Sequence, residues 1–343
     1  MSQIPDGGAS VAASSSAAVG APPARDDATS LGERILTTHL PAFMPWLLLG
    51  VAVLVSAVLR DNFFSQYSVA STFATFVPLV LVAVGQAIVV IGGGLDLSIG
   101  AIAALSSVTA ITVMGGEDSR ILLGFLVAVA TGAACGLANG LIVAGLRLQP
   151  LITTFATAAV FSGMTLWVLP TPGGRVPPGI TGTFRTAFAM VPMTVWIVLA
   201  VGGLWLLLRR TRLVRHIYAM GGDPLAAYNS LVPVRRTQTL SYVLAGAFAG
   251  LAGMAILANS GSGDPFIGSA MALDSVAAVV IGGIALRGGI GGPIGAMAGA
   301  MVLSLASQIL FFAGVPSTYR PLAAGLVVIA ALALSALTDR RKR

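Results

Sequence analysis

The chain has 343 residues, of which 56% are apolar and only 9% are charged, and its mean hydropathy is +0.93. Because an ordinary soluble domain carries about 25% charged residues, so few charges cannot cover the surface of a water-soluble globule of this length. The composition therefore excludes soluble, nucleic-acid-binding and disulfide-rich secreted proteins and leaves an integral membrane protein.

The N-terminal segment, residues 1–38, is expected to be a disordered cytoplasmic tail. Residues 1–35 are rich in Ala, Ser, Gly and Pro, a composition that cannot bury enough apolar surface to fold. They are not a signal peptide, because Arg25, Asp26 and Asp27 stand where its apolar region would have to be.

Residues 39–338 are predicted to form an all-α, polytopic bundle of about ten transmembrane helices, some of them short or broken. A helix needs about 20 apolar residues to cross a bilayer, and ten runs approach that length. The eighth run is short, so it is either a half-helix held inside the protein or a span whose ends are misplaced. The runs lie at about 42–59, 70–92, 98–114, 121–145, 151–169, 190–208, 238–258, 273–286, 293–313 and 321–337.

The basic residues test this count. With ten spans both termini lie on one side, and that side receives fourteen of the 19 Lys and Arg residues, including the basic tail at 339–343. Cytoplasmic loops carry an excess of Lys and Arg, so the pattern predicts that both termini are cytoplasmic.

Two connections are longer than plain turns. The outer one, 170–189, is rich in Pro and Gly, and the inner one, 209–237, is basic. In the inner loop Asp223 is a good N-cap and Pro224 suits the first helical position, which predicts a short helix over Leu225 to Leu231. That helix either lies at the membrane surface or is a plain linker.

Glycine clusters at 92–94 and 288–292 predict helix breaks or tight turns. The sequence Val-Val-Ile-Gly-Gly occurs at 89–93 and again at 279–283. Five identical residues in so apolar a chain are weak evidence for an internal repeat. Isolated glycines within spans are typical of closely packed membrane helices.

Two carboxylates, Asp96 and Asp274, lie at the margins of spans. Each is either a helix cap or a residue of a pathway or gate, because buried charges in membranes face protein or water. Other polar residues within spans could line a path for a polyhydroxylated solute or bond neighbouring helices. They are Gln86, Asn139, Thr153, Thr154, Asn259 and Gln308.

The residues give no catalytic set and no metal cluster. The single cysteine, Cys135, lies in an apolar run and is expected to be a packing residue, and the two histidines are far apart. The one lysine, Lys342, follows no glycine-rich phosphate loop, so any ATP must be bound by another chain. The pattern is that of a transporter.

Four stretches together resemble the inner-membrane permease subunits of bacterial ATP-binding-cassette importers for monosaccharides, the ribose-type family. Residues 93–100 read GGLDLSIG, similar to the family's GGIDLSVG, and 136–140 with 149–154 match its NG and PFIATL stretch. Residues 221–227 are similar to its GGN..AAR loop, and 264–291 to its DP…ELDAIAAVVIGG segment. The order and spacing hold from about residue 60 to the C-terminus.

This resemblance implies a transport subunit without enzymatic activity, located in the bacterial inner membrane as a multi-pass protein. A second permease copy, either identical or a paired permease, a cytoplasmic ATP-binding subunit and a periplasmic sugar-binding protein would be its partners within the lipid bilayer, and nucleic acid would not. The chain itself would bind no cofactor, since ATP and Mg would be held by the partner ATPase.

The resemblance also implies site residues. The loop 209–237 becomes the coupling loop, and its ATPase-coupling residues are Gly221, Gly222, Asp223, Pro224, Ala226 and Ala227. The solute pathway or gate is expected to involve Asp96, Ser98, Asn139, Thr153, Thr154 and Asp274.

The chain departs from the family pattern in two places. Tyr228 replaces the usual Arg after the paired alanines, and Ala272 replaces the usual Glu before Leu-Asp. These departures leave ATPase docking and the solute open. The leading hypothesis is a permease for a pentose or related sugar, and the alternatives are a stand-alone carrier or facilitator and an importer permease for nucleosides or branched-chain amino acids.

Overall fold

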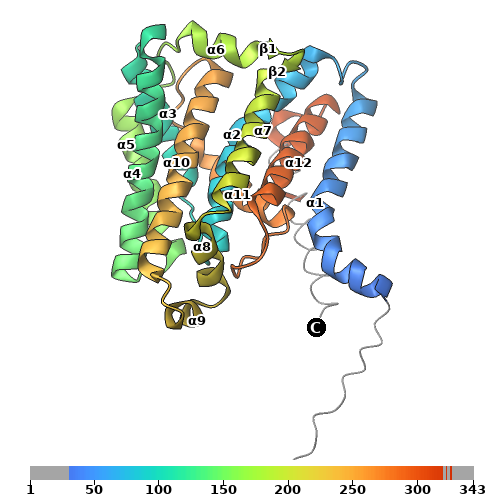
Figure 1. Ribbon diagram of the computed structural model, residues 1–343. Coiled ribbons are helices and arrows are strands. Elements are labelled where there is room, and N and C mark those ends of the chain that lie inside the picture. Colours follow the sequence, from blue (N-terminus) through green and yellow to red (C-terminus); the bar gives the residue numbers. More distant parts are fainter. Residues whose placement is uncertain (1–30, 320–321, 323–324, 327–343) are drawn as a thin grey trace, which may run out of the picture.

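The computed structural model describes residues 31–319 together with 322, 325 and 326, and these form a bundle of helices (Figure 1). The only strands among the described residues are β1 (Ala187–Phe188) and β2 (Val191–Pro192), an antiparallel pair in which Ala187 faces Pro192. The all-α class is therefore confirmed. The α-helices are α1 (Leu31–Leu59), α2 (Gln66–Ile91), α3 (Ile99–Met114), α4 (Ile121–Leu146), α5 (Pro150–Val168), α6 (Pro178–Arg185), α7 (Met193–Leu208), α8 (Arg212–Gly222), α9 (Pro224–Asn229), α10 (Val234–Ser260), α11 (Gly268–Ile281) and α12 (Pro293–Phe312).

Nine of the ten predicted spans coincide with helices α1 to α5, α7 and α10 to α12. Within the described residues, five helices are long and apolar enough to cross a membrane, and a sixth span results if α7 and α8, bent by 80°, are counted together. The structure thus supports a multi-span membrane protein but does not establish ten spans. The predicted tenth span at 321–337 and the basic tail at 339–343 are not covered by the description apart from residues 322, 325 and 326.

Two predicted boundaries were wrong. The disordered tail was expected to reach residue 38, but helix α1 already begins at Leu31. Residues 1–30 are not among the residues that the structure describes. Helix α11 begins at Gly268 and not at 273, because the apolar count stopped at the carboxylate of Asp274 although the preceding residues are helical.

The basic loop 209–237 contains a helix, α8, that was not predicted. Thr211 caps it by accepting a hydrogen bond from the N–H of Val214 at 3.4 Å. Val214, Ile217 and Met220 recur at helical spacing and are buried, while the arginines between them are exposed. The helix was not predicted because its arginines interrupt the run of apolar residues, although the apolar residues recur at helical spacing.

Helices α2 and α10 form the centre of the bundle. The apolar core of α2 is buried along most of its length, and α10 packs against α2, α3 and α4. Small residues make the close approach possible, because a methyl group on Gly132 of α4 would overlap the carbonyl oxygen of Gly246 on α10. Cys135 is buried in the same core, as expected.

The two copies of Val-Val-Ile-Gly-Gly end their helices in the same way. The second glycine is left-handed in both, with φ of +80° at Gly93 and +76° at Gly283. In each copy the N–H of that glycine donates to the carbonyl oxygen three residues back at 2.9 Å. Glycine adopts this conformation at little cost, which explains the pair of glycines after α2 and α11. The break predicted at 92–94 is therefore confirmed. The cluster at 288–292 lies in the turn between α11 and α12, where Gly288, Gly289 and Gly291 also have positive φ, so that prediction is confirmed as well.

Candidate solute pathway and coupling site

The break between α2 and α3 holds a buried polar chain. Asp96 is fully buried, and its Oδ1 accepts hydrogen bonds from the backbone N–H of Ser98 at 2.8 Å and from its hydroxyl at 2.6 Å. Asn139 on α4 donates from Nδ2 to the Ser98 hydroxyl oxygen at 2.7 Å. Three of the predicted pathway residues therefore meet in one network.

A fourth predicted residue, Thr154 on α5, joins this break through its backbone. The Thr154 hydroxyl oxygen accepts from the N–H of Leu97 at 3.0 Å and lies 3.2 Å from the carbonyl oxygen of Leu95, to which it can donate. Thr153 does not join, because its hydroxyl donates within α5 to the carbonyl oxygen of Gln149 at 3.1 Å. The adjacent threonines are thus in different environments.

Several acceptors near the break have no donor among the described residues. Asp96 Oδ2 and Asn139 Oδ1 are both enclosed and unpartnered, and so are both amide atoms of Gln86, inside α2. Buried polar atoms are nearly always hydrogen-bonded, so these oxygens can accept bonds from water or from a hydroxyl-bearing solute.

Asp274 lies apart from this network. It is the seventh residue of α11, and its side chain is exposed on the surface of the single chain, with no hydrogen bond or ion pair to any described residue. It is neither a cap nor the first residue of its helix. A carboxylate in a membrane helix is costly against lipid, so such residues usually face water or other polar groups.

The predicted coupling segment is built as its sequence indicates. Asp223 Oδ1 accepts from the N–H groups of Leu225 at 2.9 Å and Ala226 at 3.0 Å, and Pro224 opens α9. The helix ends at Asn229, two residues earlier than expected. Ala226 is exposed and Ala227 is buried, so α9 presents one face outward and anchors the other.

The end of α8 is wedged between the two breaks, an arrangement that we call the glycine junction (residues 91–93, 221–222 and 288–289). A methyl group on Gly221 would overlap the carbonyl oxygen of Ile91 and lie 2.8 Å from the backbone nitrogen of Gly289. The N–H of Gly289 donates to that same Ile91 carbonyl oxygen at 2.8 Å. A methyl group on the next residue, Gly222, would meet nothing within 4 Å.

Sequence reasoning missed two residues of the site. Tyr242 on α10 is fully buried, and its hydroxyl donates to the Leu95 carbonyl oxygen at 3.4 Å. Tyr218 on α8 donates to the carbonyl oxygen of Gly291 at 2.7 Å and ties the coupling segment to the second break. The available signal was that Tyr242 is one of only five tyrosines and lies within the predicted span 238–258. Tyr218 lies in the inner loop 209–237, where no such signal was present.

Other polar residues named from the sequence act as helix contacts. Gln308 on α12 donates to the hydroxyl oxygen of Thr75 on α2 at 2.8 Å and accepts from Thr72 at 3.3 Å. Asn259 is exposed near the end of α10. Within the part of the chain that the structure describes, no three His, Cys, Asp or Glu side chains are grouped to hold a metal ion.

Comparisons with known proteins agree with this architecture. Residues 68–332 match the family model described as branched-chain amino acid transport system / permease component. The chain is 33% identical to the ribose import permease protein of Escherichia coli K12, over 85% of this chain and 92% of that protein. It is 34% identical to the ribose import permease protein of Bacillus subtilis, over 87% and 92% of the two chains.

A third relative extends the similarity. The galactose/methyl galactoside import permease protein of Escherichia coli K12 is 28% identical over 92% of this chain and its own full length. No solved structure gives a significant match to the chain.

Proposed function

This chain belongs to the branched-chain amino acid transport system / permease component family, and from that premise we propose that it is the permease subunit of an ATP-binding-cassette importer for a monosaccharide, a pentose or a related sugar. The observation that carries this function is the identity of 33–34% to two ribose import permeases over at least 85% of the chain. It is a multi-pass protein of the bacterial inner membrane and a transport subunit, not an enzyme.

The energy comes from a partner. A cytoplasmic ATP-binding subunit, which holds ATP and Mg, docks on α8 and α9, and a periplasmic sugar-binding protein delivers the solute to the opposite side. This chain binds no cofactor of its own. The exposed face of α9 and its cap at Asp223 support α9 as the coupling helix, because they give the partner a preorganised surface.

The membrane topology follows from the charges. Ten spans with both termini in the cytoplasm put fourteen of the 19 basic residues on the inner side. That side also receives the glycine junction and the coupling segment, while α6 and the β1–β2 hairpin lie at the opposite end of the bundle (Figure 1). The binding protein would approach that opposite end.

The permease works as a pair with a second copy, identical or related, and Asp274 supports this assembly. Its exposed and unpaired carboxylate on α11 needs a polar environment, which a solute path between two copies provides. The Asp96, Ser98 and Asn139 network, with Thr154 holding the backbone, forms the inner gate of that path, and Thr153 lies beside it.

The coupling mechanism runs through the glycine junction. Because Gly221 touches the end of α2 and the turn after α11, a movement of α8 imposed by the ATPase reaches both breaks, and the less firmly held second break moves further. Packed interfaces shift between discrete arrangements and do not deform continuously, which suits alternating access.

Uptake into proteoliposomes tests the proposed function. The chain is reconstituted with the ATP-binding subunit and the binding protein of its importer, and labelled ribose, a nucleoside and leucine are offered in turn. We expect ATP-dependent uptake of the sugar. Uptake of leucine or the nucleoside alone would assign another solute, and accumulation by this chain alone in a proton gradient would show a stand-alone carrier.

A second experiment tests the coupling assignment. Charge reversal at Asp223 together with a bulky residue at Ala226 and Ala227 should abolish transport while the chain still inserts in the membrane. Since Ala227 is buried, Ala226→Trp alone is the sharper variant: it should weaken retention of the ATP-binding subunit on purification. Wild-type uptake in the triple variant would contradict the assignment.

A further inference from the structure

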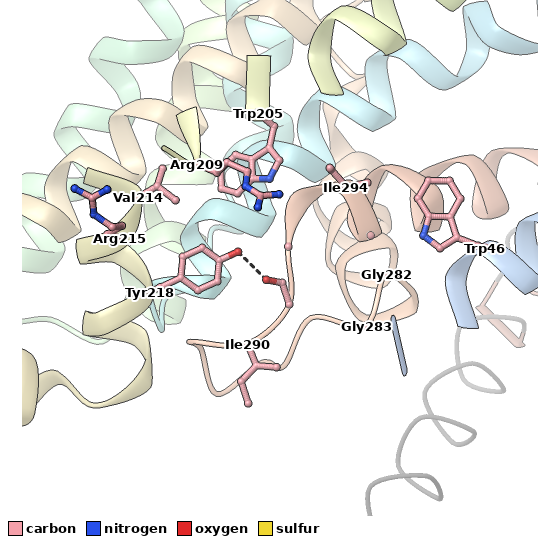
Figure 2. Close-up of a pocket in the computed structure, with 13 residues that line it drawn as sticks. Trp46, Trp205, Arg209, Val214, Arg215, Tyr218, Gly282, Gly283, Ile290 and Ile294 are labelled. Carbon is pink, nitrogen blue, oxygen red and sulfur yellow. Dashed lines mark hydrogen bonds between the residues drawn. The ribbon is translucent and has the colours of Figure 1, made fainter. Parts of the chain in front are cut away.

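A large cavity lies on the side of the bundle where α7 and α8 face the turn between α11 and α12. Its volume is about 830 Å³, and Trp46 of α1 closes its far side (Figure 2). The hydrogen bond from Tyr218 to Gly291 fixes one wall. This cavity is separate from the Asp96 network, and none of the residues of that network line it.

Within the described part of the chain, the charged residues that line the cavity are all basic. Arg209 and Arg215 are its charged lining residues, and no Asp or Glu lines it. Among the described residues neither arginine forms an ion pair, and Arg215 uses one N–H to bond the carbonyl oxygen of Arg210 at 3.2 Å. Each guanidinium has five N–H donors, so most remain available for an anion.

The tryptophans place the cavity at the cytoplasmic surface of the membrane. Tryptophan concentrates at membrane–water interfaces, and the chain has four. Trp167 and Trp196 lie near the outer ends of α5 and α7, and Trp205 lies near the inner end of α7. Trp46 is in the middle of α1 but near the inner end of the span expected at 42–59. Both inner tryptophans line the cavity.

The surface beside the cavity is apolar. Helix α7 carries no charge up to Leu208, and Leu204 and Leu207 are exposed just before Arg209. On α1, Leu47 and Val51 are exposed directly after Trp46. A molecule bound in the cavity would therefore contact arginines at one end and exposed aliphatic side chains along the rest of its length.

We propose that this cavity binds the phosphate headgroup of an anionic phospholipid of the inner leaflet. Arg209 suits a phosphodiester, because a guanidinium group forms paired, charge-assisted hydrogen bonds to its oxygens. The Arg215 side chain lies apart from it, beyond Tyr218, and adds positive charge to the same site (Figure 2). Basic pockets between membrane helices on the cytoplasmic side are suited to such headgroups, and the apolar surface above accommodates the acyl chains. The site involves the α7–α8 bend and the turn after α11, so bound lipid stabilises the region that the coupling segment contacts.

Lipid retention tests the proposal. The chain is reconstituted in vesicles of phosphatidylcholine with phosphatidylglycerol as a minor component and extracted in mild detergent, and the lipids that remain bound are quantified by mass spectrometry. The test variant is Arg209→Gln with Arg215→Gln. The matched control is Arg210→Gln with Arg212→Gln, which removes the same charge from the same exposed turn but not from the cavity lining.

We expect the wild type and the control to retain phosphatidylglycerol over phosphatidylcholine, and the test variant to lose about thirtyfold in that preference. Equal loss in both variants would overturn the proposal in favour of general surface charge. Displacement of the lipid by inorganic phosphate added in excess would assign a site for the free anion. Unchanged retention in a test variant of normal thermal stability would also overturn it.

Discussion

The break after α2 and the break after α11 begin with the same five residues and the same left-handed glycine, yet they are held in different ways. The first is short and is bonded to α4 through the hydroxyl of Ser98, to α5 through Thr154 and to α10 through Tyr242. The second is longer and carries the exposed Arg287. The side-chain hydrogen bond that fixes it comes from Tyr218.

This difference indicates that the repeat sets where a helix ends, and that side chains from other helices decide how firmly the following segment is held. The first break is anchored in the bundle, and the second depends on the coupling segment. Both touch Gly221, so α8 links a fixed element to a looser one.

The largest effect is expected from Asp96, the buried carboxylate of the first break, and its counterpart in the second break is the exposed Arg287. Asp96→Ala removes the acceptor of two buried hydrogen bonds and should lower the free energy of unfolding by about 3 kcal/mol, because buried partners of a charged group are left unpaired. Arg287→Ala should change it by less than about 0.5 kcal/mol, since the side chain is exposed. Unfolding in detergent measures both, and equal losses would show that the two breaks are anchored alike.

The glycine junction should respond next. Gly221→Ala forces a methyl group onto the Ile91 carbonyl oxygen and should cost about 2 kcal/mol, the usual range for overpacking. Gly222→Ala adds its methyl in open space and should be nearly neutral. Thermal unfolding of the two variants decides the matter; if both are neutral, α8 does not contact the breaks as described.

The adjacent threonines of α5 offer a smaller test of the first break. Thr154→Val leaves the buried N–H of Leu97 without its acceptor and should cost about 1.5 kcal/mol. Thr153→Val loses only a bond within its own helix and should cost less. A larger loss of unfolding free energy for Thr153→Val than for Thr154→Val would show that α5 does not hold the first break.

The smallest effect concerns the second break. Tyr218→Phe removes the hydrogen bond to Gly291 and should cost about 1 kcal/mol. Hydrogen exchange should quicken in residues 284–292 and stay unchanged in residues 92–98. Faster exchange in both segments would mean that the breaks move as one unit.

Much of the fold follows from the sequence, because apolar runs and turn residues act locally. Nine of the predicted apolar runs are helices, and both glycine breaks and the cap at Asp223 were predicted correctly. The tail boundary, the start of α11 and the helix α8 were not, since each contains charges that interrupt an apolar pattern. Only the packed structure reveals that the Asp274 carboxylate lies on an exposed helix face.

The sequence predicted most residues of the candidate site but not which of them contact one another. Asp96, Ser98, Asn139 and Thr154 come from four separate positions along the chain, and only the packing of α2, α4 and α5 brings them together. Thr153 and Thr154 are identical residues, and a difference of one position on a helix decides which of them faces the break. The role of Gly221 depends on contacts with two distant segments, which no local pattern encodes.

The central claim is that ATP-driven movement of the coupling segment reaches the solute path through Gly221. The decisive measurement is ATP hydrolysis and sugar uptake recorded together, in proteoliposomes that contain the permease, its ATP-binding subunit and its binding protein. The account predicts that Gly221→Ala still hydrolyses ATP but loses most of its uptake, while Gly222→Ala keeps both. Wild-type uptake by Gly221→Ala would contradict it.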